Sequence, residues 1–196
     1  YGATINIHGR DCVDAEKKAR DESEKINKSY ISPYNDIHVI AGQGTIGVEV
    51  MSQCDKLDTI IISVGGGGLI GGIGAYLKSV SPQINIIGCS PENSAVMIHS
   101  IQAGEILDME SKPTLSDGTA GGVEENSITF PICKDVIDKL IMVNESEIQQ
   151  AMVNYIKYEH SLIEGAAGTA IAALSKLKNE LKSSKVAVVI CGGNIS

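Results

Sequence analysis

The sequence predicts an α/β fold in which a mostly parallel sheet is flanked by helices, with part of a second, smaller α/β domain. Helical and strand-like patterns alternate along the 196 residues. The predicted strand at 59–64 is a continuous, β-branched run, as is typical of a strand covered on both faces. Two predicted strands end in glycine-rich turns, at Gly65 and at Gly192. Because ligands of such sheets bind beyond the carboxyl ends of the strands, we expect a binding site at these turns.

The first part of the chain indicates the end of the smaller domain. An apolar alternation at 4–8 predicts a strand, and the charged stretch 13–28 predicts a helix. The turn residues of 32–36 break this pattern. We therefore expect residues 1–36 to end the smaller domain and residues 37–196 to form most of a large one. The sequence opens without a start methionine or a leader, so we expect it to begin inside a fold.

The large domain reads as an ordered alternation of strands and helices. Its predicted elements up to residue 143 are a strand at 38–40, a helix at 45–54, the strand at 59–64, a helix of small residues after it, a strand at 84–88, a helix at 95–103, a loop at 108–127, a helix at 133–138 and a strand at 140–143. Asn144 with Glu147 three residues later predicts a helix start. An alanine-rich helix from Gly165 to about 181 and a strand at 186–190 complete the domain.

Composition and charge exclude several classes of protein. The net charge of −8 and the pI near 5.0 argue against a nucleic-acid-binding surface, which needs a basic stripe. No apolar run approaches the roughly 18 residues of a membrane helix, so we expect no membrane partner. The five cysteines are odd in number and show no C-x-x-C spacing. Reduced thiols in a cytoplasmic protein fit this pattern best.

The glycine run Gly65–Gly68 predicts an anion site between a strand and a helix. Without Cβ atoms the backbone N–H groups can converge on a phosphate, and the following helix adds its unpaired donors and dipole. The alternative is a helix packed closely on its strand. Packing explains one or two glycines, whereas four occur in a row here.

The identity of the phosphate ligand is open at this point. Gly66, Gly68 and Gly71 formally match a dinucleotide fingerprint, but the next strand ends in Cys89-Ser90-Pro91, without the acidic residue that holds the ribose. The glycine run is not a Walker loop either, because no Gly-Lys-Ser/Thr follows it. The four histidines have no metal-ligand spacing, and we expect no metal site. The Asp117-Gly118 pair and Glu164 lie in glycine-rich contexts, where a plain turn or a charge at a helix start explains them equally well.

Several short motifs occur together, in a fixed order, along the whole chain. They are Tyr1-Gly2-Ala3, Ile40-Ala41-Gly42-Gln43-Gly44-Thr45-Ile46, Val64-Gly65-Gly66-Gly67-Gly68-Leu69, Ser116-Asp117-Gly118, Leu162-Ile163-Glu164-Gly165-Ala166-Ala167-Gly168 and Cys191-Gly192-Gly193-Asn194. In this combination the chain resembles the C-terminal part of the fold-type II pyridoxal-phosphate enzymes, in particular the group of threonine/serine dehydratases and serine racemases.

The resemblance implies a set of cofactor contacts within a cofactor-binding large domain. The amides of Gly65–Gly68, with Leu69 closing the loop, would take the phosphate of pyridoxal 5'-phosphate. Gly118 and Glu164 would lie around the ring. Cys191 matches a position, usually serine, that faces the pyridine nitrogen, where a neutral group keeps the ring a weaker electron sink and suits prompt β-elimination.

The resemblance also implies what the chain lacks. The Schiff-base lysine and the second cofactor loop of the family match no residues here and are expected upstream of Tyr1, so no catalytic residue is assigned to this chain. Racemase-like members bind a divalent cation through acids that match Ser90 and Val96, and neither residue is an acid.

The expected function is that of a pyridoxal-phosphate-dependent ammonia-lyase. It would convert a small amino acid, L-threonine or L-serine, into a 2-oxo acid and ammonia, as a cytoplasmic homo-oligomer. A serine or related amino-acid racemase of the same fold is the first alternative, and a nucleotide-binding domain of the Rossmann type is the second. We expect residues 1–196 alone to be inactive.

Overall fold

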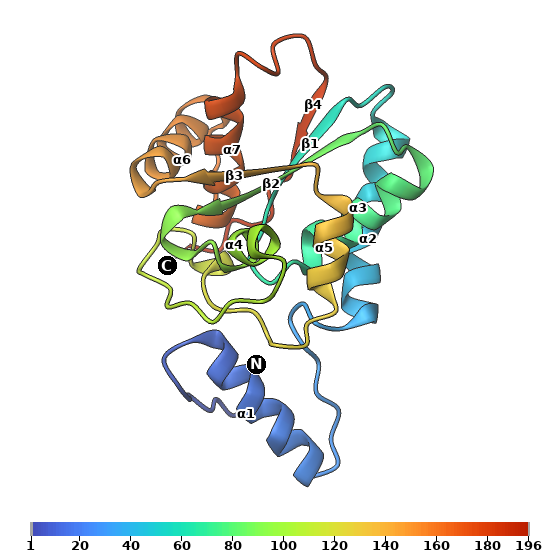
Figure 1. Ribbon diagram of the computed structural model, residues 1–196. Helices are drawn as coiled ribbons and strands as arrows, with labels where there is room; N and C mark the ends of the chain where they lie inside the picture. Colours follow the sequence, from blue (N-terminus) through green and yellow to red (C-terminus); the bar gives the residue numbers. More distant parts are fainter. Residues whose placement is uncertain (1, 196) are drawn as a thin grey trace.

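The computed structural model describes residues 2–195, which are organised around a parallel sheet (Figure 1). Its strands are β1 (Thr59–Ser63), β2 (Asn85–Pro91), β3 (Lys139–Val143) and β4 (Val186–Val188). They lie in the order β3-β2-β1-β4, and each neighbouring pair is parallel. The predicted α/β fold with a parallel sheet is confirmed.

Helices cover both faces of the sheet, as Figure 1 shows. One face packs against α2 (Ile37–Gln53), α3 (Gly68–Val80) and α5 (Thr129–Val136), and the other packs against α6 (Glu145–Glu159) and α7 (Gly165–Leu177). The central strand shows why its sequence is apolar throughout. Ile60 and Ile62 belong to the first core and Ile61 to the second, because successive side chains of a strand point to opposite faces. All three are fully buried.

The topology leaves a crevice at the carboxyl edge of the sheet. From β1 the chain moves outward through β2 to β3 and then returns to the opposite side of β1 to form β4. The strand order therefore reverses between β1 and β4, and ligands of open α/β sheets bind at such a reversal. The segments that begin at Gly65 and at Cys191 follow these two strands.

The predicted strand at 4–8 is wrong. No strand forms there, and Ile5 and Ile7 are 83% and 93% exposed. A strand needs a hydrogen-bonded neighbour, and no strand within residues 2–195 pairs with this segment. The charged helix does form, as α1 (Cys12–Lys25), and lies apart from the sheet layers in Figure 1. The domain boundary near residue 36 stays a prediction.

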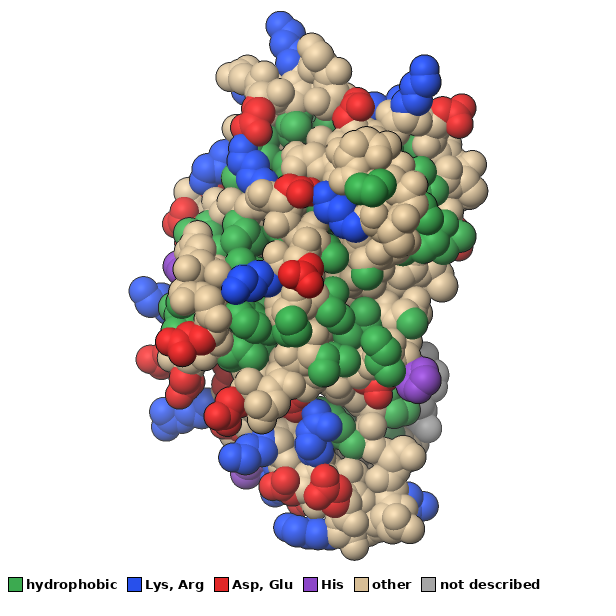
Figure 2. Space-filling view, turned by 45° about the vertical axis from the view of Figure 1, so that its right-hand side comes forward, with side chains coloured by type: hydrophobic (Ala, Val, Ile, Leu, Met, Phe, Trp, Pro, Cys, Tyr) green, Lys and Arg blue, Asp and Glu red, His purple; other side chains and the backbone are tan. Residues whose placement is uncertain are grey.

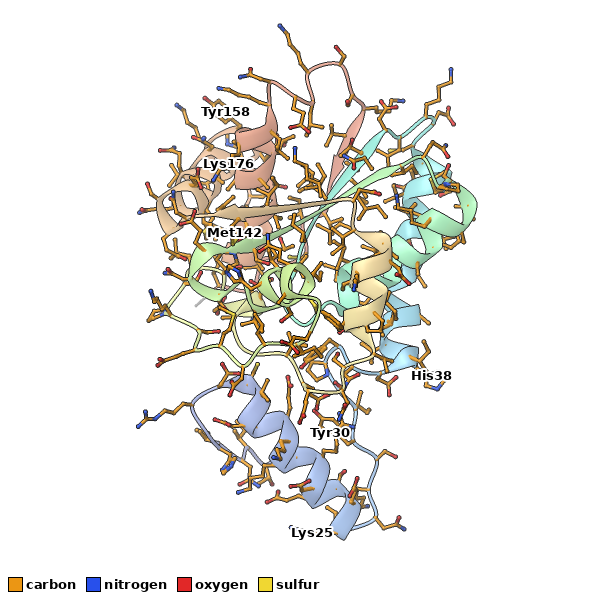
Figure 3. The ribbon with its side chains drawn as sticks, viewed as in Figure 1. Lys25, Tyr30, His38, Met142, Tyr158 and Lys176 are labelled. Atoms are coloured by element: carbon orange, nitrogen blue, oxygen red, sulfur yellow. The ribbon has the colours of Figure 1, made fainter. Side chains whose placement is uncertain are left out.

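The predicted strand at 38–40 is also wrong, because these residues form the first turn of α2. The Asp36 carboxylate accepts hydrogen bonds from the backbone N–H groups of His38 and Val39, at 2.7 and 3.2 Å. An aspartate in this position caps a helix start and outweighs the strand preference of the β-branched residues that follow. The His38 side chain projects outward from this first turn (Figure 3).

Other predictions differ in their bounds only. The capping box is confirmed, since the Asn144 side chain accepts from the Glu147 N–H at 3.0 Å and Glu147 accepts from the Asn144 N–H at 2.8 Å. Helix α4 (Val96–Ala103) matches its prediction closely, whereas α5 begins at Thr129 rather than at 133. Short 3₁₀ turns occur at Glu92–Ser94 and Asp117–Thr119.

Positive and negative side chains are interspersed on the face shown in Figure 2. Within residues 2–195 there is no helix with both the length and the apolar character that crossing a membrane requires.

Candidate cofactor-binding site

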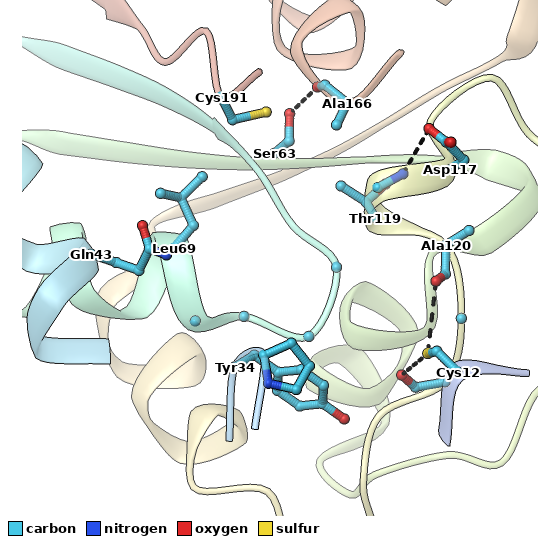
Figure 4. A pocket seen from close by; sticks show the side chains of 18 of the residues that line it. Cys12, Tyr34, Gln43, Ser63, Leu69, Asp117, Thr119, Ala120, Ala166 and Cys191 are labelled. Carbon is cyan, nitrogen blue, oxygen red and sulfur yellow. Dashed lines mark hydrogen bonds between the residues drawn. The ribbon is translucent and has the colours of Figure 1, made fainter. Parts of the chain in front are cut away.

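A cavity of about 430 Å³ opens at the carboxyl edge of the sheet (Figure 4). Its size is typical of a small-molecule site. It lies beside the strand reversal, and its lining includes the glycine loop, which we define as residues 65–69. The other residues that line it are Cys12, Glu16, Pro33, Tyr34, Gln43, Ser63, Asp117, Gly118, Thr119, Ala120, Gly121, Gly122, Glu164, Ala166 and Cys191.

The glycine loop presents a row of unpaired backbone donors. None of its N–H groups, from Gly65 to Leu69, donates to an acceptor within the part of the chain that the structure describes. Gly67 has the left-handed conformation, with φ of 88°, and caps the start of α3. Converging amides at the positive end of a helix form an anion site, so the loop fits a phosphate group.

Each glycine of the loop is also required by packing. A Cβ atom at Gly65 would lie 2.9 Å from the backbone of Thr119, and one at Gly67 would lie 2.6 Å from the Cys133 sulfur. Gly66 and Gly68 both pack against Tyr34. The expectation that packing accounts for only one or two of the glycines is therefore wrong. The unpaired amides, rather than the glycines as such, indicate the anion site.

The cavity lining also contains Gly118 and Glu164. A Cβ atom at Gly118 would lie 3.5 Å from a carboxylate oxygen of Glu164, so the two residues are neighbours. Glu164 also holds the segment that follows Cys191: its N–H donates to the Gly192 carbonyl at 3.1 Å, and its carboxylate accepts from the Asn194 N–H at 3.4 Å.

Cys191 lies at the rim of the cavity, with its sulfur directed toward Ser63 in Figure 4. The thiol donates to the Glu164 carboxylate at 4.0 Å. Desolvation of the sulfur and, secondly, the nearby carboxylate raise the pKa of Cys191 to about 11. Cys191 is therefore a neutral thiol at physiological pH.

The structure brings residues to the cavity that sequence reasoning missed. Tyr34 packs on the glycine loop, and its hydroxyl donates to the Glu16 carboxylate at 3.1 Å and accepts from the Glu124 N–H at 2.8 Å. Burial raises the pKa of both Tyr34 and Glu16. The one available signal was an aromatic residue inside the turn of 32–36, where turn composition favours small polar residues.

Cys12 is a further residue at the cavity that the sequence did not single out. Its thiol is directed at the carbonyl oxygen of Ala120, 3.8 Å away. Desolvation by burial and the charges of Glu16 and Asp11 raise the pKa of Cys12 to about 12. Among the described residues, no lysine lines the cavity, and no three His, Cys, Asp or Glu side chains gather as metal ligands.

Comparison with known proteins agrees with this geometry. The model of a family described as pyridoxal-phosphate dependent enzyme matches residues 1–192. An L-threonine ammonia-lyase of Thermotoga maritima is 40% identical over 195 residues, covering 99% of this chain and 48% of that protein. The catabolic L-threonine dehydratase TdcB of Escherichia coli is 38% identical over 197 residues, covering 100% of this chain and 60% of that protein. The chain thus spans about half to three fifths of the length of these relatives.

Solved structures show the same fold. The processed form of threonine deaminase isoform 2 from Solanum lycopersicum superposes with a TM-score of 0.88 at 30% identity, covering 97% of this chain and 56% of that one. Serine racemase from Dictyostelium discoideum superposes with a TM-score of 0.82 at 35% identity, covering 94% of this chain and 60% of that one.

Proposed function

Since this chain belongs to the family of pyridoxal-phosphate dependent enzymes, we propose that the protein containing it is an ammonia-lyase that converts L-threonine or L-serine into a 2-oxo acid and ammonia. The observation that carries the proposal is the row of unpaired amides along the cavity, in a chain 40% identical to an L-threonine ammonia-lyase. When bound, pyridoxal phosphate supplies an electron sink for the negative charge that develops when the α-proton leaves.

The residues of this chain would hold and surround the cofactor. The amides of Gly65–Gly68 and Leu69 are assigned to its phosphate, because they are unpaired and line the cavity. Gly118 and Glu164, which also line the cavity, are assigned to the sides of the ring. Cys191 is assigned to the pyridine nitrogen, to which a neutral thiol offers a weak hydrogen-bonding partner without a negative charge.

The remaining assignments concern the whole protein. We place the boundary between the smaller and the large domain at residues 1–36 and 37–196. The lysine that would bind the cofactor covalently and move the α-proton lies outside this chain in our proposal, which fits a cavity lined by no lysine among the described residues. We further propose that the whole protein is a cytoplasmic homo-oligomer that acts on a small amino acid.

An amino-acid racemase is the second candidate. It is favoured by the similarity to serine racemase from Dictyostelium discoideum, at 35% identity. The two positions that match the cation ligands of racemase-like members, Ser90 and Val96, argue for the lyase. The buried Ser90 hydroxyl is used within the protein, donating to the Val64 carbonyl at 2.7 Å, and the side chain at 96 is a buried valine. The nucleotide-binding alternative loses its support, because its fingerprint lies within the match to the pyridoxal-phosphate family.

The test measures products from the complete protein with L-threonine and with L-serine. We expect release of a 2-oxo acid, with little D-isomer, and no change on chelator treatment, because Ser90 and Val96 are not ligands. D-amino acid as the main product would favour the racemase. Loss of activity on chelation and its return with magnesium would contradict metal independence, and no turnover of either substrate would contradict the lyase.

A further inference from the structure

Helix α5 holds the glycine loop through two side chains. The Thr129 hydroxyl donates to the carbonyl oxygen of Gly66 at 2.6 Å, and the Cys133 thiol donates to that of Gly67 at 3.6 Å. Thr129 and Cys133 are four residues apart in the helix and therefore share a face. Both residues are fully buried. One face of α5 thus contacts two consecutive carbonyls of the loop, of which that of Gly67 also accepts from the Gly71 N–H of α3 at 2.9 Å.

A second hydroxyl fixes the direction of this hydrogen bond. The Ser127 hydroxyl oxygen lies 2.6 Å from that of Thr129. A carbonyl oxygen only accepts, so the single hydroxyl proton of Thr129 points to Gly66, and Ser127 must donate to Thr129. The chain of donors therefore runs from Ser127 through Thr129 to Gly66, and both hydroxyl-bearing residues are buried away from competing water.

The geometry of the peptide bond then sets where the amides point. No peptide bond within residues 2–195 is cis, and in a planar trans peptide the C=O and the N–H point to opposite sides. Because the carbonyls of Gly66 and Gly67 face α5, the N–H groups of Gly67 and Gly68 face away from it. Both glycines line the cavity, whereas no residue of α5 does. Helix α5 therefore turns the Gly67 amide toward the cavity through Thr129, and it shares the orientation of the Gly68 amide with the Gly71 N–H.

We propose that Thr129 is a positioning residue for the phosphate group of the cofactor. Its hydroxyl fixes the peptide plane between Gly66 and Gly67, so that the amides are already aimed when the phosphate arrives. Pre-aligned donors need no reorganisation on binding, which makes each hydrogen bond to the anion more favourable. The proposal rests on the proposed function, because it requires the glycine loop to be the phosphate site.

Two substitutions separate the hydroxyl from the shape of Thr129. Thr129→Val keeps the branched side chain and loses the donor, whereas Thr129→Ser keeps the donor and loses a methyl group. The readout is the ratio of the dissociation constants of pyridoxal and pyridoxal phosphate, measured by absorbance titration of the complete apoprotein. Pyridoxal lacks only the phosphate, so this ratio reports the phosphate contacts and not the rest of the site.

We expect a large ratio in the wild type and in Thr129→Ser. In Thr129→Val the ratio should fall roughly tenfold, the factor that corresponds to about 1.4 kcal/mol, with the affinity for pyridoxal unchanged. An unchanged ratio in Thr129→Val, or an equal fall in Thr129→Ser, would overturn the role of the hydroxyl. A wild type that binds both compounds equally well would instead overturn the phosphate site itself, and with it this part of the proposed function.

The neighbouring Cys133 provides a second pair of variants should Thr129→Val fail to fold. Cys133→Ala leaves the Gly67 carbonyl with the Gly71 N–H as its remaining donor, and Cys133→Ser restores a side-chain donor from α5. The ratio should fall in the alanine variant and return in the serine variant. Equal ratios in these two variants would contradict the control of the amides by α5.

Discussion

Gly67 and Gly42 are both glycines of conspicuous motifs, yet their surroundings differ. Gly67 has φ of 88°, and a Cβ atom there would lie 2.6 Å from the Cys133 sulfur, whereas Gly42, inside α2, has no atom within 4 Å of such a Cβ. We expect Gly67→Val to lower the free energy of unfolding of the cofactor-free protein by about 2 kcal/mol or more. Gly42→Ala should raise it by up to about 1 kcal/mol, through helix propensity.

Chemical denaturation of both variants measures this difference. Equal effects at the two positions would mean that the loop adapts to a side chain. Because the loss at Gly67 arises without a ligand, substitutions at this glycine do not test phosphate binding, and the side-chain variants of α5 are the sharper probe.

Cys191 tests the assignment to the pyridine nitrogen. Since its pKa is about 11, the thiol and the hydroxyl of Cys191→Ser are both neutral over the working range, and the pH profiles of elimination should superimpose between about pH 6 and pH 9. Cys191→Asp should shift products from the 2-oxo acid toward the D-amino acid, because a carboxylate keeps the ring nitrogen protonated and stabilises the carbanion. An unchanged product ratio in the aspartate variant would place Cys191 away from the ring.

At the scale of elements, α1 is attached to the rest of the molecule by polar contacts. The Asp11 carboxylate accepts from the Gly122 N–H at 2.9 Å, and one terminal nitrogen of Arg20 donates to both carboxylate oxygens of Glu124, at 2.8 and 2.9 Å. Arg20 also stacks over the Tyr30 ring, 4.6 Å from its centre, in the region between α1 and the sheet layers (Figure 3). Glu16 is the one charged residue of α1 that is buried where the helix meets the rest of the molecule, at 9% exposure.

Glu16 should make the attachment of α1 sensitive to pH. Burial is the main cause that raises its pKa above the ordinary 4.5. A raised pKa in the folded state gives stability that is present below the unfolded pKa and is lost as the pH rises through the folded value. Glu16→Gln keeps an acceptor for the Tyr34 hydroxyl and removes this titration.

We therefore expect the stability of the wild type, relative to Glu16→Gln, to fall as the pH rises above about 4.5. Thermal unfolding across this range measures the difference, with the exposed Glu24→Gln of the same helix as the control. The same pH dependence in both variants would show that the buried carboxylate of Glu16 is not the cause.

At the scale of the whole molecule, the chain lines the cavity that is proposed to hold the cofactor. The glycine loop, Gly118, Glu164 and Cys191 surround the cavity, whereas no lysine among the described residues lines it. We expect residues 1–196 alone to lack amino-acid lyase activity, because covalent attachment of the cofactor needs a partly desolvated lysine with a lowered pKa. Borohydride reduction with pyridoxal phosphate, followed by mass spectrometry, measures the attachment. One lysine labelled stoichiometrically, together with 2-oxo acid production, would contradict this expectation.

Features that depend on neighbours along the chain could be predicted from the amino-acid sequence. The isoleucine run of β1 predicted burial on both faces, since side-chain direction alternates along a strand whatever surrounds it. The capping box at Asn144 and the turn after β1 were likewise predicted, because they involve backbone groups within a few residues. The resemblance of the motifs predicted the family of the chain, and the match over residues 1–192 confirms it.

Contacts between distant residues depend on how the elements pack in three dimensions. Residues 4–8 have a strand pattern but no partner strand among residues 2–195, and a strand exists only where another chain segment completes its hydrogen bonds. The contact of Tyr34 with the glycine loop and the hydrogen bond from Thr129 to Gly66, 63 residues away, follow no period in the sequence. The periodicity of apolar residues predicts which face of an element is buried. The orientation of the loop amides instead depends on which side chains of α5 pack against the loop carbonyls.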